Sequence, residues 1–137
     1  MTKERLLERF QDFKNALERL KESLQIEAYQ DIIQDIIIDG VIQRFEFTFE
    51  LSWKLMKLFL EYEGIEANSP RSAIRKAYEI NMIEDGEAWI DMMIDRNKIS
   101  HVYDEEMAKQ IYDRIKEVHI INLEKLLNRF EKVIENL

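Results

Sequence analysis

The chain contains no cysteine, which excludes disulfide bonds, thiolate metal ligands and thiol nucleophiles. This absence fits a reducing cytosol, and we expect a cytoplasmic protein. Turn residues are also scarce, with one proline and three glycines in 137 residues, whereas 35% of the residues are charged and 46% are hydrophobic. Because sheets need frequent turns, this composition predicts an all-α helical bundle.

Long uncharged hydrophobic stretches are missing as well. The opening residues MTKERLLERF carry charges throughout, so they do not contain the apolar centre of a signal peptide. No uncharged run approaches the roughly 18 residues that a membrane span requires. We therefore expect a soluble protein that does not interact with membranes.

An excess of positive charge is absent too, since the formal net charge is −8. Affinity for nucleic acid comes largely from the neutralisation of phosphates, so this balance argues against broad electrostatic binding. If the protein binds RNA, a small set of cations must overcome a repulsive surface. Such binding would be confined to one local site.

The periodicity of apolar residues predicts the first two helices. Steps of three and four over residues 3–24 indicate a helix with one apolar stripe. Residues 31–62 are apolar on more than one face, so this helix is either central in the bundle or also in contact with another chain. Its remaining face carries charged residues, namely Glu46, Glu50, Lys54 and Lys57. We expect that stripe to face solvent.

Capping signals divide the rest of the chain. Ser69 followed by Pro70 predicts the start of a short helix that runs to about residue 81. An Asp-Gly pair at residues 85–86 marks a break before a fourth helix, and Asp104 can cap the last helix. We predict a single domain over residues 1–137, built as an up-and-down bundle of four main helices plus a short extra helix.

The fourth helix carries the most reactive stretch of the chain, RNKISHVY at residues 96–103. It places a permanent cation, a group that titrates near neutral pH and a phenol close together, in a chain with only two histidines. On an ideal helix Arg96 and Tyr103 share a face, whereas His101 lies about 140° away from Arg96. Either the helix ends or distorts near Ser100, or a second copy completes the site across a symmetric dimer.

The spacing Arg-x4-His-x-Tyr in this stretch resembles the signature of the HEPN superfamily, specifically of the HepT-like toxins encoded beside minimal nucleotidyltransferases. The segment DGVIQRFEFTFELSWK at residues 39–54 and the later SPRSAIRKA are similar to the nucleotidyltransferase substrate-binding proteins of the same superfamily. The likeness covers roughly residues 39–103. It implies a HEPN-like helical fold, a homodimer whose motif helices face a shared cleft, and a separately encoded minimal nucleotidyltransferase as partner.

Metal-independent RNA cleavage is the activity that this resemblance implies, and the residue types suit it. A neutral His101 can take the proton of a ribose 2′-hydroxyl, which then attacks the adjacent phosphorus. Arg96 can stabilise the charge that gathers on the phosphoryl oxygens. Asn97 and Ser100 can orient the phosphate or the imidazole. No metal ligand or other cofactor is expected.

The resemblance also implies roles for residues around the catalytic pair. In HepT-like proteins the motif tyrosine receives adenylate from the partner nucleotidyltransferase, which silences the toxin, so the resemblance implies modification of Tyr103. It further implies that three arginines outside the motif contact phosphate or add positive charge to the cleft, namely Arg44, Arg71 and Arg75.

Other interpretations remain open. The acidic balance and the similarity of residues 39–54 also fit a non-catalytic subunit that binds substrate for, or regulates, a separate nucleotidyltransferase. A plain helical scaffold would require the motif to be accidental. We interpret His119 as a packing or surface histidine, because no metal-ligand spacing surrounds it. Glu46 and Glu50 could form an acid and base pair, although the matched Lys54 favours surface ion pairing.

Overall fold

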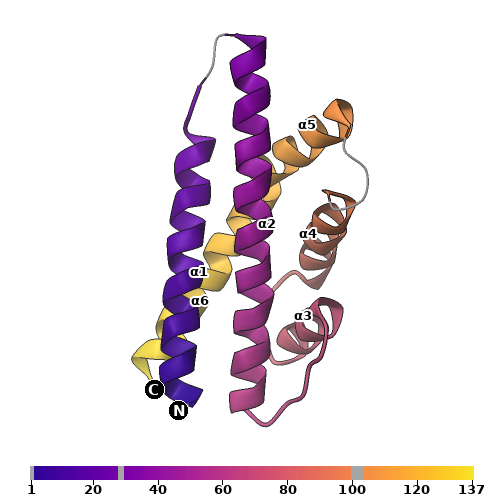
Figure 1. Ribbon diagram of the computed structural model, residues 1–137. Coiled ribbons are helices and arrows are strands. Elements are labelled where there is room, and N and C mark those ends of the chain that lie inside the picture. Colours follow the sequence, from indigo (N-terminus) through magenta and orange to yellow (C-terminus); the bar gives the residue numbers. More distant parts are fainter. Residues whose placement is uncertain (1, 28–29, 100–103) are drawn as a thin grey trace.

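The chain folds into a bundle of helices (Figure 1). The structure is a computed structural model that describes residues 2–27, 30–99 and 104–137. Within these ranges no residue lies in a β-strand, and no helix is long and apolar enough to cross a membrane. The helices, in chain order, are α1 (Thr2–Leu24), α2 (Asp31–Tyr62), α3 (Pro70–Glu79), α4 (Gly86–Ile99), α5 (Glu105–Arg114), the π-helical segment η1 (Ile115–His119) and α6 (Ile120–Glu135). The predicted all-α fold is confirmed.

The second helix, α2, is the centre of the bundle. It packs against α1, α3, α4 and α5, and Figure 1 shows α1 on one side of it with α3 and α4 on the other. The segments α5, η1 and α6 follow one another as a single rod that crosses behind α1 and α2 in this view. Because α2 is covered on several sides, its apolar residues extend around more than one helical face.

Apolar side chains from all six α-helices and from η1 form the core. The largest fully buried ones are Trp89, Phe13, Phe45, Phe49, Phe130, Leu6, Leu17, Leu20, Leu55, Met56, Leu60 and Ile74. Burial of one such side chain contributes about 1.5–3 kcal/mol relative to leaving it exposed. The ring of Trp89 lies 6.4 Å from that of Phe49, measured between centroids. This aromatic contact holds α4 against α2.

Two helix starts follow the capping signals of the sequence. The side chain of Ser69 accepts a hydrogen bond from the main-chain N–H of Ser72 at 3.1 Å, and Pro70 occupies the first turn of α3. The side chain of Asp104 accepts a hydrogen bond from the main-chain N–H of Met107 at 2.9 Å, at the start of α5. Both predicted caps are confirmed.

The last part of the chain departs from the single regular helix that its periodicity predicts. Five residues, Ile115–His119, form a π-helical segment between α5 and α6. A π turn closes its hydrogen bonds between residues five apart, rather than four apart, and such turns occur frequently at functional sites. The wider turn changes which side chains of this rod point in the same direction.

Candidate functional site

The RNKISHVY motif begins in the last turn of α4. Arg96 is half-buried there and the side chain of Asn97 is exposed. The remaining predicted site residues of the motif, Ser100, His101 and Tyr103, lie outside the described residues. The expected end or distortion of the helix near Ser100, and the orientation of the imidazole and the phenol, therefore stay predictions.

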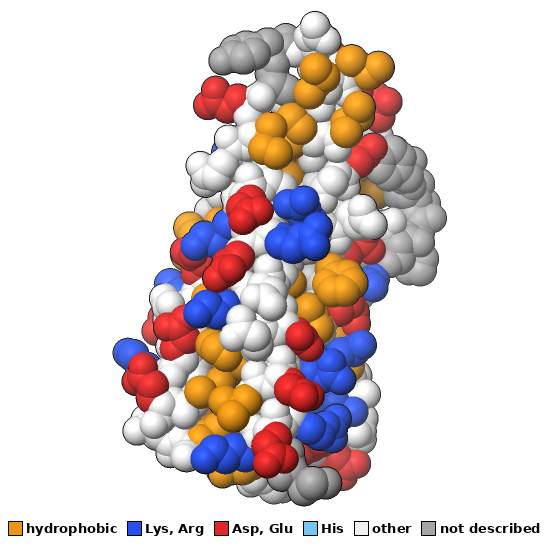
Figure 2. All heavy atoms as spheres, turned by 60° about the vertical axis from the view of Figure 1, so that its left-hand side comes forward, with side chains coloured by type: hydrophobic (Ala, Val, Ile, Leu, Met, Phe, Trp, Pro, Cys, Tyr) orange, Lys and Arg blue, Asp and Glu red, His pale blue; other side chains and the backbone are white. Residues whose placement is uncertain are grey.

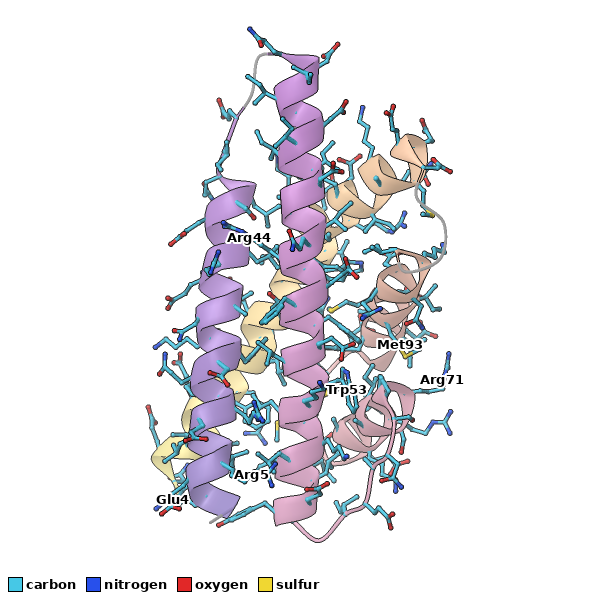
Figure 3. All side chains as sticks on the ribbon, viewed as in Figure 1. Glu4, Arg5, Arg44, Trp53, Arg71 and Met93 are labelled. Carbon is cyan, nitrogen blue, oxygen red and sulfur yellow. The ribbon has the colours of Figure 1, made fainter. Side chains whose placement is uncertain are left out.

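A carboxylate of α2 compensates the charge of Arg96. The Nε atom of Arg96 lies 3.2 Å from Oε1 of Glu50, and 24% of the Arg96 side chain is exposed. Glu50 also accepts a hydrogen bond from Nε1 of Trp53 at 3.2 Å and lies 3.9 Å from Nζ of Lys54. Figure 3 shows Trp53 on the side of α2 that faces α3 and α4. An ion pair between two helices thus holds the guanidinium in an otherwise apolar stripe of α4.

The charged stripe of α2 is not fully solvated, which corrects the expectation from the sequence. Glu46, Glu50 and Lys57 are half-buried, and Lys54 is exposed. The physical reason is that α4 packs on this side of α2 and brings Arg96 to Glu50. Glu50 therefore pairs with the exposed Lys54, as expected, and also with Arg96 of α4.

Glu46 belongs to the same electrostatic neighbourhood. Burial raises the pKa of the Glu46 carboxyl above its usual 4.5, the positive charge of Arg96 opposes that rise, and the negative charge of Glu50 adds to it. The motif sequence contains neither of these two acidic side chains. A phosphate that approaches Arg96 also approaches two carboxyl groups, so the stabilisation of its negative charge depends strongly on the guanidinium.

The three arginines predicted outside the motif do not converge on Arg96. Arg44 donates from Nη1 to the main-chain oxygen of Arg19 at 2.7 Å, and it lines a hollow of about 810 Å³ between α1 and α2. Arg71 and Arg75 line a second hollow, of about 500 Å³, between α3 and α4. Arg96 lines neither hollow, and Figure 3 shows Arg44 and Arg71 on opposite sides of α2. Their contact with phosphate stays a prediction.

The surface over α1 and α2 mixes charges of both signs. Figure 2 shows Lys and Arg side chains interspersed with Asp and Glu side chains on this face, without one continuous basic area. This distribution agrees with the net charge of −8. Because non-specific binding of nucleic acid depends on many phosphate contacts, this face is poorly suited to it.

A second charged cluster lies one residue before Arg96 in the chain. Asp95 is buried, and both of its carboxylate oxygens are engaged. Arg114 donates from Nε to Oδ2 and from Nη2 to Oδ1, each at 2.8 Å, and Nε2 of His119 lies 2.7 Å from Oδ2. His119 is buried, as a packing histidine should be, but its contact with Asp95 was not predicted. The cluster joins α4 to α5 and η1.

Charged partners control the protonation of Asp95. Burial acts to raise the pKa of Asp95, but the hydrogen bonds from His119 and Arg114 outweigh it and lower this pKa from 3.8 to about 2. The hydrogen bond with Asp95 also raises the pKa of Arg114. Asp95 is therefore a carboxylate, and Arg114 a cation, across the physiological pH range.

The described residues contain no group of three or more potential metal ligands.

The stability of the protein should reflect the lowered pKa of Asp95 in acid. The pKa of Asp95 is 3.8 without its partners and about 2 in the folded protein. The carboxylate therefore contributes about 2 kcal/mol to the free energy of unfolding above about pH 4. That contribution disappears as the pH falls towards 2. We expect urea unfolding at a series of pH values to show that, as the pH falls from about 4 to about 2, the free energy of unfolding decreases more in the wild type than in Asp95→Asn. Parallel curves for the two proteins would contradict it.

Fold and motif together define the class of the protein, a helical bundle that presents a cationic motif at the end of its fourth helix. The sequence profile of a family described as "nucleotidyltransferase substrate binding protein like" matches residues 8–132. The chain belongs to this family, which includes the HepT-like proteins.

Known relatives agree with this placement. A Haemophilus influenzae protein named probable ribonuclease HepT is 35% identical over 89 residues, and the match spans 61% of this chain and 61% of that protein. A crystal structure from Thermus thermophilus has 34% identity and a TM-score of 0.75, with 85% of this chain and 97% of that chain covered. A Haemophilus influenzae structure, described as the fold of a substrate-binding domain of a nucleotidyltransferase, has 29% identity and a TM-score of 0.70 over 94% and 98% of the two chains.

One further comparison concerns the fold alone. A chain of the MntA–HepT toxin–antitoxin complex has a TM-score of 0.75 at 16% identity, with 93% of this chain and 97% of that chain covered. The same arrangement of helices is therefore kept at low sequence identity. The chain spans less than two thirds of the length of the protein named probable ribonuclease HepT, so that protein's activity is a proposal for this chain.

Proposed function

We propose that this chain is the toxin component of a toxin–antitoxin pair, a cytoplasmic, metal-independent endoribonuclease that acts as a homodimer. The observation that carries the proposal is the complete RNKISHVY motif of the sequence, which begins in the last turn of α4 with Arg96 held 3.2 Å from Glu50. Membership of the HepT-like family and the likeness to a protein named probable ribonuclease support it.

The proposed reaction is an internal transfer of the RNA phosphate. Neutral His101 takes the proton of a ribose 2′-hydroxyl, and the 2′-oxygen forms a bond to the adjacent phosphorus. The bond from phosphorus to the 5′-oxygen breaks, and that oxygen leaves as a hydroxyl after it takes a proton from an imidazolium or from water. Arg96 stabilises the charge on the phosphoryl oxygens, with Asn97 and Ser100 as orienting groups. The products carry a cyclic phosphate and a 5′-hydroxyl.

A second copy of the chain would complete the site. On one ideal helix His101 lies about 140° from Arg96, so one α4 helix does not aim both groups at the same phosphate unless it distorts. Ile94, two residues before Arg96, has 39% of its surface exposed. Such an exposed apolar group beside the motif favours contact with a second α4 helix across a two-fold axis.

RNA cleavage without metal is the direct test of this function. We expect the purified protein to cut transfer RNA or messenger RNA in the presence of EDTA and to leave cyclic phosphate ends, because His101 and Arg96 supply the proton transfer and the charge stabilisation. The measurement is gel analysis of labelled RNA with mass spectrometry of the fragment ends. Intact RNA, or equal cleavage by His101→Ala, would exclude the proposed activity.

The proposal includes a separately encoded minimal nucleotidyltransferase as the antitoxin. This partner would silence the toxin by transfer of adenylate to Tyr103. The family description, and the solved relatives described as a substrate-binding domain of a nucleotidyltransferase and as part of a toxin–antitoxin complex, support such a partner.

A non-catalytic substrate-binding or regulatory subunit of that nucleotidyltransferase is the second candidate. The two carboxyl groups near Arg96 and the net charge of −8 favour it, because both oppose the binding of RNA. Both candidates predict that the chain co-purifies with a small nucleotidyltransferase. A chain that binds this partner but leaves RNA intact in the cleavage test would establish the second candidate over the first.

A further inference from the structure

The Asp95 cluster has no part in the proposed proton transfer, yet Asp95 is the residue immediately before Arg96 in α4. Asp95 is 3% exposed and His119 is 1% exposed, and the exposed fraction of the Arg114 side chain is 40%. The cluster contributes to stability, but stability does not require a buried carboxylate at this position. Replacing buried ion pairs by apolar residues of similar volume is often neutral or stabilising in proteins.

The π-helical segment brings the two partners of Asp95 together. Arg114 and His119 are five residues apart, which on a regular α-helix would place them about 140° apart around the axis. The π segment Ile115–His119 closes hydrogen bonds between residues five apart and widens the turn at this point. As a result both side chains reach Oδ2 of Asp95.

The surroundings of the His119 ring determine which of its nitrogens carries the proton. The ring stacks on Phe45 with centroids 5.4 Å apart, and its Nδ1 is buried without a hydrogen-bond partner among the described residues. A proton on this Nδ1 would leave a buried donor unsatisfied, which is unfavourable. The arrangement therefore favours a proton on Nε2, directed at Asp95.

Asp95 and Arg96 connect the end of α4 to two different parts of the bundle. Consecutive residues on a helix point about 100° apart. The carboxylate of Asp95 is held by the rod of α5 and η1, and the guanidinium of Arg96 is held by Glu50 of α2. With the carboxylate held at both oxygens, α4 cannot rotate about its axis without breaking short hydrogen bonds. The direction in which Arg96 leaves the helix is thereby fixed.

We propose that Asp95, clamped by Arg114 and His119, is a positioning residue that sets the orientation of the Arg96 guanidinium in the site. The expected effect on kcat rests on the proposed function. In this proposal Asp95 acts through Arg96 and not by contact with the substrate. A small misplacement of a catalytic group can lower a rate by about 100-fold. The clamp therefore acts on the rate of the chemical step more than on RNA binding.

Three substitutions separate positioning from simple packing. His119→Phe keeps an aromatic ring beside Phe45 but removes the donor to Asp95. His119→Gln restores a donor at a similar distance, and Asp95→Asn keeps the shape of the side chain while it removes the charge. Asp35→Asn is the control, because Asp35 is an exposed aspartate of α2 and is not among the charged groups that act on Asp95 or Arg114. Circular dichroism establishes that each variant is folded.

Two measurements test the proposal on the full chain. The first is kcat and KM for RNA cleavage, and the second is the nuclear magnetic resonance signal of the Arg96 Nε–H group. We expect His119→Phe and Asp95→Asn to lower kcat by up to about 100-fold with little change in KM, and to shift the Arg96 signal towards that of a solvated arginine. His119→Gln should recover both readouts, and Asp35→Asn should match the wild type.

Unchanged kcat and an unchanged Arg96 signal in folded His119→Phe and Asp95→Asn would overturn the proposal. If His119→Phe does not fold, the isosteric Asp95→Asn decides by the same two readouts. If the wild type cuts no RNA, the proposed function fails, and the Arg96 signal alone then decides whether the clamp positions the guanidinium. The two failures are therefore distinguishable.

Discussion

Replacing Arg96 by alanine is expected to lower the kcat for RNA cleavage by about 100- to 1000-fold, the usual effect of removing one group that stabilises a developing negative charge. The surroundings of Arg96 strengthen this expectation. Glu50 lies 3.2 Å from the guanidinium, and the charge of Arg96 also opposes the raised pKa of Glu46. Without the guanidinium, the phosphate would approach these two acidic side chains with only the exposed Lys54, 3.9 Å from Glu50, to offset their charge.

The same substitution should change stability much less than activity. Glu50 keeps its hydrogen bond from Trp53 and its contact with Lys54, and a partly exposed ion pair contributes about 0–1 kcal/mol. Arg96→Lys should retain part of the activity, because it keeps the charge but not the planar fork. Arg5→Ala removes an exposed arginine at the start of α1, away from α4 (Figure 3), and should leave kcat unchanged. Equal losses in Arg96→Ala and Arg5→Ala would show a general charge effect.

Adenylylation of Tyr103 should abolish cleavage. The modification adds a bulky, negatively charged group two residues from His101 and seven from Arg96 in the sequence. Its phosphate is expected to pair with the guanidinium of Arg96, and its bulk to keep RNA out of the proposed cleft. We expect incubation with the partner nucleotidyltransferase, ATP and Mg²⁺ to add the mass of one or more adenylates to the wild type, and the modified protein to leave RNA intact.

Tyr103→Phe provides the decisive comparison for this modification. It removes the phenolic oxygen that would receive the adenylate, so it should stay unmodified and keep cutting RNA in the presence of the partner. Tyr78→Phe is the control, because Tyr78 is another tyrosine with 52% of its surface exposed and should not alter the modification. Modification and silencing of Tyr103→Phe would place the adenylate on a different residue.

The helices were largely predictable because the signals that define them are local. The predicted span of residues 31–62 coincides with α2, and the caps at Ser69 and Asp104 lie where they were expected. Each of these signals needs only a few neighbouring residues, such as a side chain that accepts a hydrogen bond from an N–H three residues later. The π segment was missed, because apolar spacing continues through Ile115–His119 without a break.

The candidate site was only partly predictable. The motif drew attention to Arg96, but it did not indicate that Glu50 is the partner of its guanidinium. The Glu46 to Lys57 stripe looked solvated because its spacing satisfies a surface helix equally well. Asp95 gave no signal of its own, since an acidic residue next to an arginine is common in a charged chain.

By itself the sequence determined the all-α fold, the positions of the long helices and the family motif, because periodicity, capping and spacing are properties of neighbouring residues. Only the tertiary structure decided which faces meet. It placed Glu50 against Arg96 and brought Arg114 and His119, 19 and 24 residues away, to one carboxylate of Asp95. The physical reason is that such contacts depend on the rotation of each helix about its axis and on the π turn, which pairwise packing of the whole bundle determines.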